Sequence, residues 1–256
     1  MAAEARTAKR LARMSELTQP LEPRGRFATW RSRVRAAATD PESLRAWSVI
    51  ANDGIIATAG ILEGFAGAGA GHATLVTAAT SATIAGMLSA GGSEWAEAAA
   101  EREGQLSAAA EEAVDLARQP EVERAELIAH YEAKGLRSEL AAEVATDLMA
   151  HDALDAQLES GHGILELTSR ADVMRAGIGG AIAYGIGAFI PLVITLSAPV
   201  EAEPWLILVA AIVSLTLTSI VGARTGHMNL ARTLRRTLTV GISTLVVSYL
   251  VGRMIF

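Results

Sequence analysis

Long apolar stretches alternate with polar segments along the chain. A helix that crosses a bilayer needs about 20 predominantly apolar residues. Stretches that reach or approach this length lie at residues 48–70, 74–93, 176–197, 205–223 and 238–256. The pattern therefore predicts an all-α membrane protein with five transmembrane helices.

The longest polar region, residues 102–166, follows the second span. Its alanines and leucines recur at helical spacing, so the region predicts packed helices rather than disorder. Pro120 opens one helix, Gly135 ends it, and Ser138 begins the next. Together with a continuation of the second span, these helices make a three-helix insert between spans 2 and 3.

Charge is divided unevenly between these regions. The formal net charge is −6, yet residues 1–47 hold ten basic and five acidic residues, whereas residues 94–166 hold eighteen acidic and five basic residues. Cytoplasmic loops of membrane proteins carry an excess of Arg and Lys. The basic arm and the Arg-rich loop at residues 224–236 therefore predict a cytoplasmic N-terminus and insert, with the C-terminus outside.

These features divide the chain into four predicted parts. Asp40 is the expected N-cap of the first helix and Pro41 its first residue. The basic arm favours attraction to anionic lipid headgroups over nucleic-acid binding. The parts are a basic cytoplasmic N-terminal arm at 1–46, transmembrane helices 1 and 2 at 47–100, a cytoplasmic acidic helical metal-binding domain at 101–168, and transmembrane helices 3 to 5 at 169–256.

Composition excludes several kinds of chemistry. The chain has no cysteine, which rules out disulfides, thiolate metal sites and iron–sulfur clusters. It contains no Walker loop, dinucleotide fingerprint or nucleophile elbow, so we expect neither an enzyme nor an organic cofactor. Five dispersed histidines argue against a zinc site. Oxygen donors with an occasional Met favour iron(II) or manganese(II) instead.

The first span carries two carboxylates, Asp53 and Glu63. A charged side chain near the bilayer centre costs about 2.5–3.5 kcal/mol, so such acids usually face a partner, a water-filled cavity or an ion path. We predict that Asp53 belongs to a cation path near the inner mouth. Asn52 beside it is a candidate helper, although backbone hydrogen bonding at the helix entry is the role that its position favours. The alternative for Asp53 is an ion pair with Arg45 or Arg175. Glu63 either shares the pore or is an acid near the outer mouth that water reaches.

Glycines recur at helix-contact spacing along the same span. They form the patterns Gly60-x-x-x-Gly64 and Gly67-x-x-x-Gly71. Small residues four positions apart let membrane helices approach closely, and dimerisation is the use we expect. The pattern is common in membrane helices, so it is a weak signal by itself.

Acidic pairs at i, i+3 mark the insert. They are Glu112 with Asp115, and Glu123 with Glu126. Such pairs place carboxylates about 5 to 6 Å apart at Cβ, close enough to hold a cation between helices, although solvated acidic faces are common. Core packing is the alternative for Met149, and a helix-end cap for His151. The last helix offers further donors at Met149, His151, Asp152, Asp155 and Glu159.

Several short segments share a pattern with one membrane protein family. The first span opens with Asn52-Asp53-Gly54, and the second contains Ala85-Gly86-Met87-Leu88-Ser89 followed by Ser93-Glu94-Trp95. The later segments are Tyr131-Glu132-Ala133-Lys134-Gly135-Leu136, Leu148-Met149-Ala150-His151-Asp152, Gly187-Ala188-Phe189-Ile190-Pro191-Leu192 and Ser248-Tyr249-Leu250-Val251-Gly252-Arg253. In this order, over about residues 45–256, the chain resembles the vacuolar iron transporter family, also called the VIT1/CCC1 family.

This resemblance implies a homodimer of five-helix protomers with the ion path at the dimer interface. It also implies export of cytosolic iron(II), and often manganese(II), in exchange for protons, with glutamates of the insert binding metal. Asp53 matches the pathway aspartate of the family. The acidic ligands of the insert match Glu112, Asp115, Glu123 and Glu126, and the acidic end of the second helix matches Glu94, Glu97 and Glu101.

The chain departs from the family pattern at a few positions. Ala90 stands where the family commonly has Met, with Met87 one turn earlier, so the soft ligand of the pore is either missing or moved to Met87. Asp115 replaces a longer Glu. The last insert helix ends with fewer acids than usual, which leaves Met149 and Glu159 as its candidate ligands. Glu63 matches no position with a known family role.

We therefore expect a divalent metal ion transporter that exports iron(II), with manganese(II) as a second substrate, in exchange for protons. A membrane-anchored metal-binding or ferroxidase-like module without transport is one alternative. A membrane structural protein without transport is another. High Arg and Ala content with only two lysines indicates a GC-rich genome and hence a bacterial plasma membrane.

Overall fold

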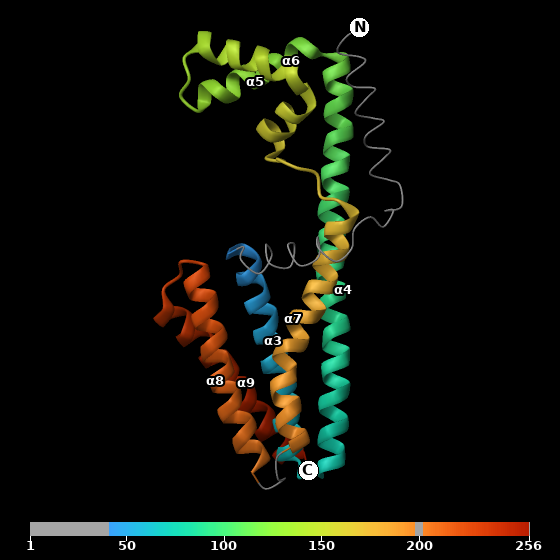
Figure 1. Cartoon of the computed structure of the whole chain (residues 1–256), viewed down its shortest axis with the longest axis vertical. Coiled ribbons are helices and arrows are strands. Elements are labelled where there is room, and N and C mark those ends of the chain that lie inside the picture. The colour runs from blue at the N-terminus through green and yellow to red at the C-terminus, as the bar shows by residue number, and fades with distance from the viewer. Residues whose placement is uncertain (1–40, 198–201, 256) are drawn as a thin grey trace, which may run out of the picture. The chain divides into compact units, whose positions relative to one another are not determined.

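The computed structural model describes residues 41–197 and 202–255 of the chain. All regular elements in these two ranges are α-helices, as the sequence predicts, and no strand occurs there. Asp40 and the arm before it lie outside the described residues, so their predicted roles stay predictions. Figure 1 shows the helices, which are α3 (Pro41–Gly67), α4 (His72–Arg118), α5 (Pro120–Ala133), α6 (Ser138–His162), α7 (Arg170–Ser197), α8 (Glu203–Thr225) and α9 (Leu230–Ile255).

Five of the described helices are long and apolar enough to cross a membrane, which confirms the predicted number of spans. They are α3, α4, α7, α8 and α9. α3 begins at Pro41, as expected, because proline has a helical φ and its missing N–H would have no partner there. It ends at Gly67 rather than at residue 70. At that end Gly69 takes a left-handed φ of 72°, and the N–H of Ala70 bonds to the carbonyl of Phe65 at 3.0 Å.

α4 is a single helix of 47 residues that extends far beyond the second span. The residues after Glu94 are rich in Ala and Glu, which are strong helix formers, so the helix continues once the apolar stretch ends. It ends at Arg118 because Pro120 lacks an N–H and disfavours a helical conformation in the residue before it. The region predicted as a three-helix insert thus holds the later part of α4, then α5 and α6.

The described residues divide into two compact units. Residues 96–174 form the insert unit, and residues 41–95 with 175–255 form the span unit. The sequence predicts these divisions near 100 and 168. α4 and α7 contribute to both units because each is a continuous helix across a division.

The core of the span unit is built largely on α3. This helix packs against α8 and α9, which also pack against each other (Figure 1). Its fully buried aliphatic residues are Ile55, Ala59 and Leu62. They share one core with residues of α4, α8 and α9, namely Leu75, Ala79, Ile207, Ala211, Leu215 and Leu245.

Glycines set the shortest distance between α3 and α7. A Cβ added at Gly187 would lie 1.9 Å from the carbonyl oxygen of Ala51, and one at Gly54 would lie 2.3 Å from the carbonyl oxygen of Tyr184. Real Cβ atoms do not approach backbone oxygens so closely, so only glycine fits at these two contacts. The two helices are therefore in direct backbone contact.

The glycines predicted to support dimerisation contact α9 of the same chain. A Cβ at Gly67 would lie 2.2 Å from the carbonyl oxygen of Tyr249, and those at Gly60 and Gly64 would lie 3.4 Å from atoms of Ser248. The fourth glycine, Gly71, has no neighbour at this distance. The spacing thus predicts close helix contact correctly, but three of these glycines contact a helix of their own protomer. Dimerisation itself stays a prediction.

The insert unit has a small core between α5 and α6 (Figure 1). Leu127, Ala145 and Ala156 are buried there, and Met149 packs against them. α5 ends at Ala133, and Gly135 takes a φ of 98°, so the predicted stop is correct.

α6 begins at Ser138 as predicted but is interrupted at Asp152, which has the non-helical angles φ −155° and ψ 94°. Oδ1 of Asp152 accepts a hydrogen bond from the N–H of Asp155 at 3.2 Å. This is the geometry of an N-cap, so Asp152 starts a second helical segment. The interruption is not predicted from the sequence, because Asp also occurs within helices.

Substitution of Gly187 by Ala should destabilise the span unit, because its Cβ would collide with the backbone of Ala51. Overpacking of this kind costs about 1–3 kcal/mol. The matched control is Gly92→Ala, where a Cβ meets nothing within 4 Å and the gain in helix propensity should be slightly stabilising. Thermal unfolding of the purified protein in detergent measures both. Equal melting temperatures for the two variants would contradict the proposed backbone contact.

Candidate metal sites

Asp53 lies on an exposed side of α3. Ala57, Ile61 and Phe65 follow it at i+4, i+8 and i+12 and are exposed as well. Because residues four apart share a helix face, these four residues form one line, here called the exposed stripe. The stripe is apolar apart from the carboxylate of Asp53.

Asn52, beside Asp53, is held by α8. The hydroxyl of Thr218 donates a short hydrogen bond to Oδ1 of Asn52. The Thr218 hydroxyl also lies 2.9 Å from the carbonyl oxygen of Ser214 in its own helix. Interhelical bonds of this kind fix side-chain orientation in membranes, so Asn52 is a positioned neighbour of Asp53.

Glu63 lies in the interior of the span unit. It is only 5% exposed, and its Oε1 is buried without a hydrogen-bond partner. Asp53 and Glu63 therefore do not share the exposed stripe, although the sequence places both on one span. The prediction that Glu63 shares a pore with Asp53 is not supported by this arrangement within one chain.

The candidates on the first half of α4 face α7. The sulfur of Met87 lies against Gly185, at 3.0 Å from the position of an added Cβ. Cγ of Glu94 lies against Gly180, at 2.6 Å from the corresponding position. The missing side chains of these two glycines therefore make room for the Met87 and Glu94 side chains between α4 and α7.

Glu97 and Glu101 continue along α4 into the insert unit, and both are exposed. Oε1 of Glu101 accepts a hydrogen bond from the amide of Gln105 at 3.1 Å. The carbonyl of the same amide accepts the backbone N–H of Thr168 at 2.7 Å. Gln105 thus links the acidic face of α4 to the segment that precedes α7.

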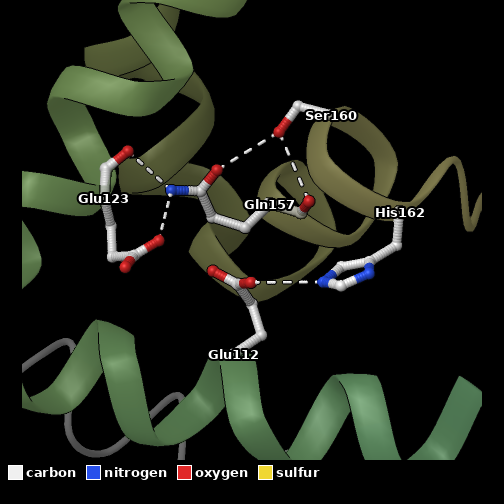
Figure 2. Close-up of polar contacts among 5 residues, drawn as sticks. All are labelled: Glu112, Glu123, Gln157, Ser160 and His162. Atoms are coloured by element: carbon white, nitrogen blue, oxygen red, sulfur yellow. Dashed lines mark hydrogen bonds and ion pairs between the residues drawn. The ribbon is translucent and has the colours of Figure 1, made fainter.

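Three helices of the insert unit bring polar side chains together around two glutamates (Figure 2). Glu123 of α5 is 8% exposed. The amide nitrogen of Gln157 donates to Oε2 of Glu123 at 3.0 Å and lies 2.6 Å from its backbone carbonyl oxygen. Glu112 of α4 places Oε2 3.6 Å from Nε2 of His162 in α6. The hydroxyl of Ser160 lies 3.2 Å from the amide oxygen of Gln157 and completes the group, here called the glutamate cluster.

The glutamate cluster holds more negative charge than it can compensate. Burial raises the pKa of Glu123 from its usual 4.5 to about 7, and contact with Glu112 and the charge of Asp115 add to the rise. Oε1 of Glu112 is buried without a hydrogen-bond partner. A proton on Glu123, or a cation between the two carboxylates, would reduce the excess negative charge and give the unpartnered Oε1 of Glu112 an interaction.

The structure brings only some of the predicted insert ligands together. Glu112 and Glu123 meet, with Asp115 within electrostatic range. Glu126 and Glu159 are exposed, and Met149 packs against the core, as its alternative interpretation stated. Among the described residues of a single chain, no group of three or more Asp, Glu or His side chains could hold a metal ion. The predicted metal ligands therefore stay predictions.

Several residues of these sites are not predicted from the sequence. Gln157 and His162 join the glutamate cluster, and Thr218 orients Asn52. Gln157 and His162 lie 45 and 50 positions from Glu112 along the chain, and no spacing rule connects them. The sequence gave one signal for His162, which is a histidine in the last turn of a predicted helix. A histidine there can approach acidic residues of a neighbouring helix.

Comparison with known families gives one match. A profile of the VIT family matches residues 44–253 of the chain. A search of curated proteins finds no match. The matched range covers all five candidate spans except a few terminal residues and includes the whole insert unit.

Substitution of Glu123 by Gln should change how stability depends on pH. Because the folded state raises the pKa of Glu123 from 4.5 to about 7, the folded protein binds more protons in this range and loses stability as pH rises through it. Glu123→Gln should remove most of this loss, since the amide cannot ionise. Glu126→Gln, an exposed acid on the same helix, is the control. Melting temperatures measured from pH 4.5 to 7 test this, and parallel curves for wild type and Glu123→Gln would contradict it.

Proposed function

Because the chain belongs to the VIT family, we propose that it exports divalent metal ions, iron(II) first and manganese(II) second, from the cytoplasm in exchange for protons. The chain is a multi-pass membrane protein of a family of metal ion transporters. In this proposal the N-terminus and the insert unit are cytoplasmic, as the distribution of basic residues favours. A bacterial plasma membrane is the proposed location.

The observation that carries the proposal is the position of Asp53 on the exposed stripe. A carboxylate that faced lipid near the bilayer centre would cost about 2.5–3.5 kcal/mol. Since no other part of the described chain covers the stripe, a second copy is its natural partner. Two stripes facing each other would place two Asp53 carboxylates beside a shared path, and a divalent cation would compensate their charges.

Thr218 and Asn52 support this role for Asp53. The side-chain oxygen Oδ1 of Asn52 accepts the hydrogen bond from Thr218. The side-chain amide nitrogen of Asn52 therefore points away from that contact. The residue is thereby fixed in one orientation next to the carboxylate. A fixed neighbour keeps the geometry at the mouth of the path constant as ions pass.

The glutamate cluster supports metal collection by the insert unit. Its carboxylates are oxygen ligands of the kind that iron(II) and manganese(II) bind. Because the pKa of Glu123 is raised to about 7, metal and proton compete for the same oxygens near neutral pH. Glu97, Glu101, Glu126 and Glu159 are exposed acids that would raise the local cation concentration. A membrane-anchored metal-binding module without transport remains the second candidate, and this cluster is the observation that favours it.

Substitution of Asp53 by Asn should strongly reduce metal transport. We expect uptake of iron(II) and manganese(II) into proteoliposomes with an imposed pH gradient to fall by at least about tenfold, which corresponds to ~1.4 kcal/mol in the barrier. A metal-quenched dye inside the vesicles measures the uptake. Glu132→Gln, which removes one exposed carboxylate from α5, should leave it unchanged. If wild type transports metal and Asp53→Asn transports it equally well, Asp53 is not part of the path. If wild type binds metal but shows no flux, the membrane-anchored metal-binding module is favoured.

Cysteine cross-linking tests the proposed dimer directly, because the chain has no cysteine of its own. Ala57→Cys lies on the exposed stripe, and two copies should form a disulfide on mild oxidation if their Cα atoms come within about 7 Å. Val213→Cys on α8 is also exposed in the single chain and should not cross-link. Covalent dimers on a non-reducing gel for Val213→Cys but not for Ala57→Cys would place the interface elsewhere.

A further inference from the structure

Glu63 is an ionisable group of the span unit that the proposed ion path does not use. It is 5% exposed within a single chain, so its own protomer covers it. Asp53, ten positions earlier on the same helix, is exposed. A path between two protomers along the exposed stripe therefore passes Asp53 and not Glu63.

Within the described residues, no positive group pairs with the Glu63 carboxylate. Its Oε1 has no hydrogen-bond partner, and no ion pair to Glu63 occurs within the described residues. Within the span unit, the described titratable side chains on the helices packed around α3 lie on all four of these helices. They are His72 of α4, Arg175 and Tyr184 of α7, Arg224 of α8, and Arg232, Arg235, Arg236, Tyr249 and Arg253 of α9. Glu94 also lies on α4, but in contact with Gly180 of α7.

An ionised carboxylate buried without a partner is costly, so a cation bound to Glu63 would stabilise the span unit. A metal ion needs several donor atoms, commonly six for iron(II) and manganese(II). No group of three Asp, Glu or His side chains surrounds Glu63 or any other described residue. A proton needs only the carboxylate itself, so a proton is the cation that this site can hold.

We propose that Glu63 is a proton-binding site inside each protomer, separate from the metal path at Asp53, and that it carries the proton exchanged for metal. The site takes up one proton to form the carboxylic acid and releases the same proton on the opposite side. The coupling role depends on the proposed function, whereas proton binding by Glu63 does not. Metal and protons would then use different routes through one dimer.

Flux measurements test the coupling role. Proteoliposomes containing a metal-quenched dye and a pH-sensitive dye report metal and proton movement together. Glu63→Gln should still move metal down its concentration gradient, but proton movement and acceleration by a pH gradient should be lost. Asp53→Asn should lose both movements. A proton-to-metal ratio equal to that of wild type in Glu63→Gln would overturn the coupling role.

Infrared difference spectra between acidic and alkaline pH test proton binding without any need for transport. The carboxylic acid C=O band of Glu63 should disappear in Glu63→Gln, shift in Glu63→Asp, and persist in Asp53→Asn and Glu123→Gln. Glu63→Gln should also fold at least as well as wild type, since the amide has nearly the same shape and no charge.

The two experiments separate the two proposals. If wild type shows the C=O band of Glu63 but no metal flux, the proposed metal–proton exchange is wrong and proton binding by Glu63 is still supported. An unchanged band in Glu63→Gln would overturn the proton site whatever the flux. If Glu63→Gln failed to fold, an unshifted band in Glu63→Asp would overturn it equally.

Discussion

Close contact between α3 and its neighbours is the constraint on which the span unit depends. Lipid tails are as apolar as leucine, so helices in a bilayer gain little from hydrophobic burial against each other and associate through tight packing and interhelical hydrogen bonds. Gly187 lets α7 touch the backbone of α3, Gly67 does the same for α9, and Thr218 bonds α8 to Asn52. α3 therefore has one side closed by its own chain and one side open.

This division of α3 decides what its two carboxylates can do. Asp53 is on the open side, where a second copy can complete a path, and Glu63 is on the closed side, where its own chain covers it. The two acids have the same chemistry and similar costs of burial. Their proposed roles differ because the packing of the other helices gives them different surroundings.

The insert unit shows the opposite arrangement, in which charge is gathered rather than separated. Glu112 and Glu123 come from different helices, and the neutral amide of Gln157 holds Glu123 without compensating its charge. A basic residue in place of Gln157 would pair with the carboxylate and occupy its oxygens. The neutral amide keeps the carboxylates oriented and available to a proton or a cation, which is consistent with a role in collecting metal.

Much of the fold could be predicted because local patterns determine it. Apolar length fixes the five spans, Pro41 and Pro120 start helices because of the geometry of proline, and Gly135 ends one because it readily adopts a positive φ. The interruption of α6 at Asp152 escaped prediction, since the same residue can also lie within a helix.

The sequence by itself determined the helices, the family and the acids that carry charge into the membrane, because each of these depends on neighbouring residues or short motifs. The tertiary structure alone decided which side of α3 stays open and that the glycines of that helix contact α9. It also decided that Glu112 contacts Glu123, whereas the predicted acids Asp115 and Glu126 do not join them at one point. Helical periodicity gives the angle between two side chains on one helix. It does not say which neighbouring helix covers them, because that depends on packing between segments far apart in the chain.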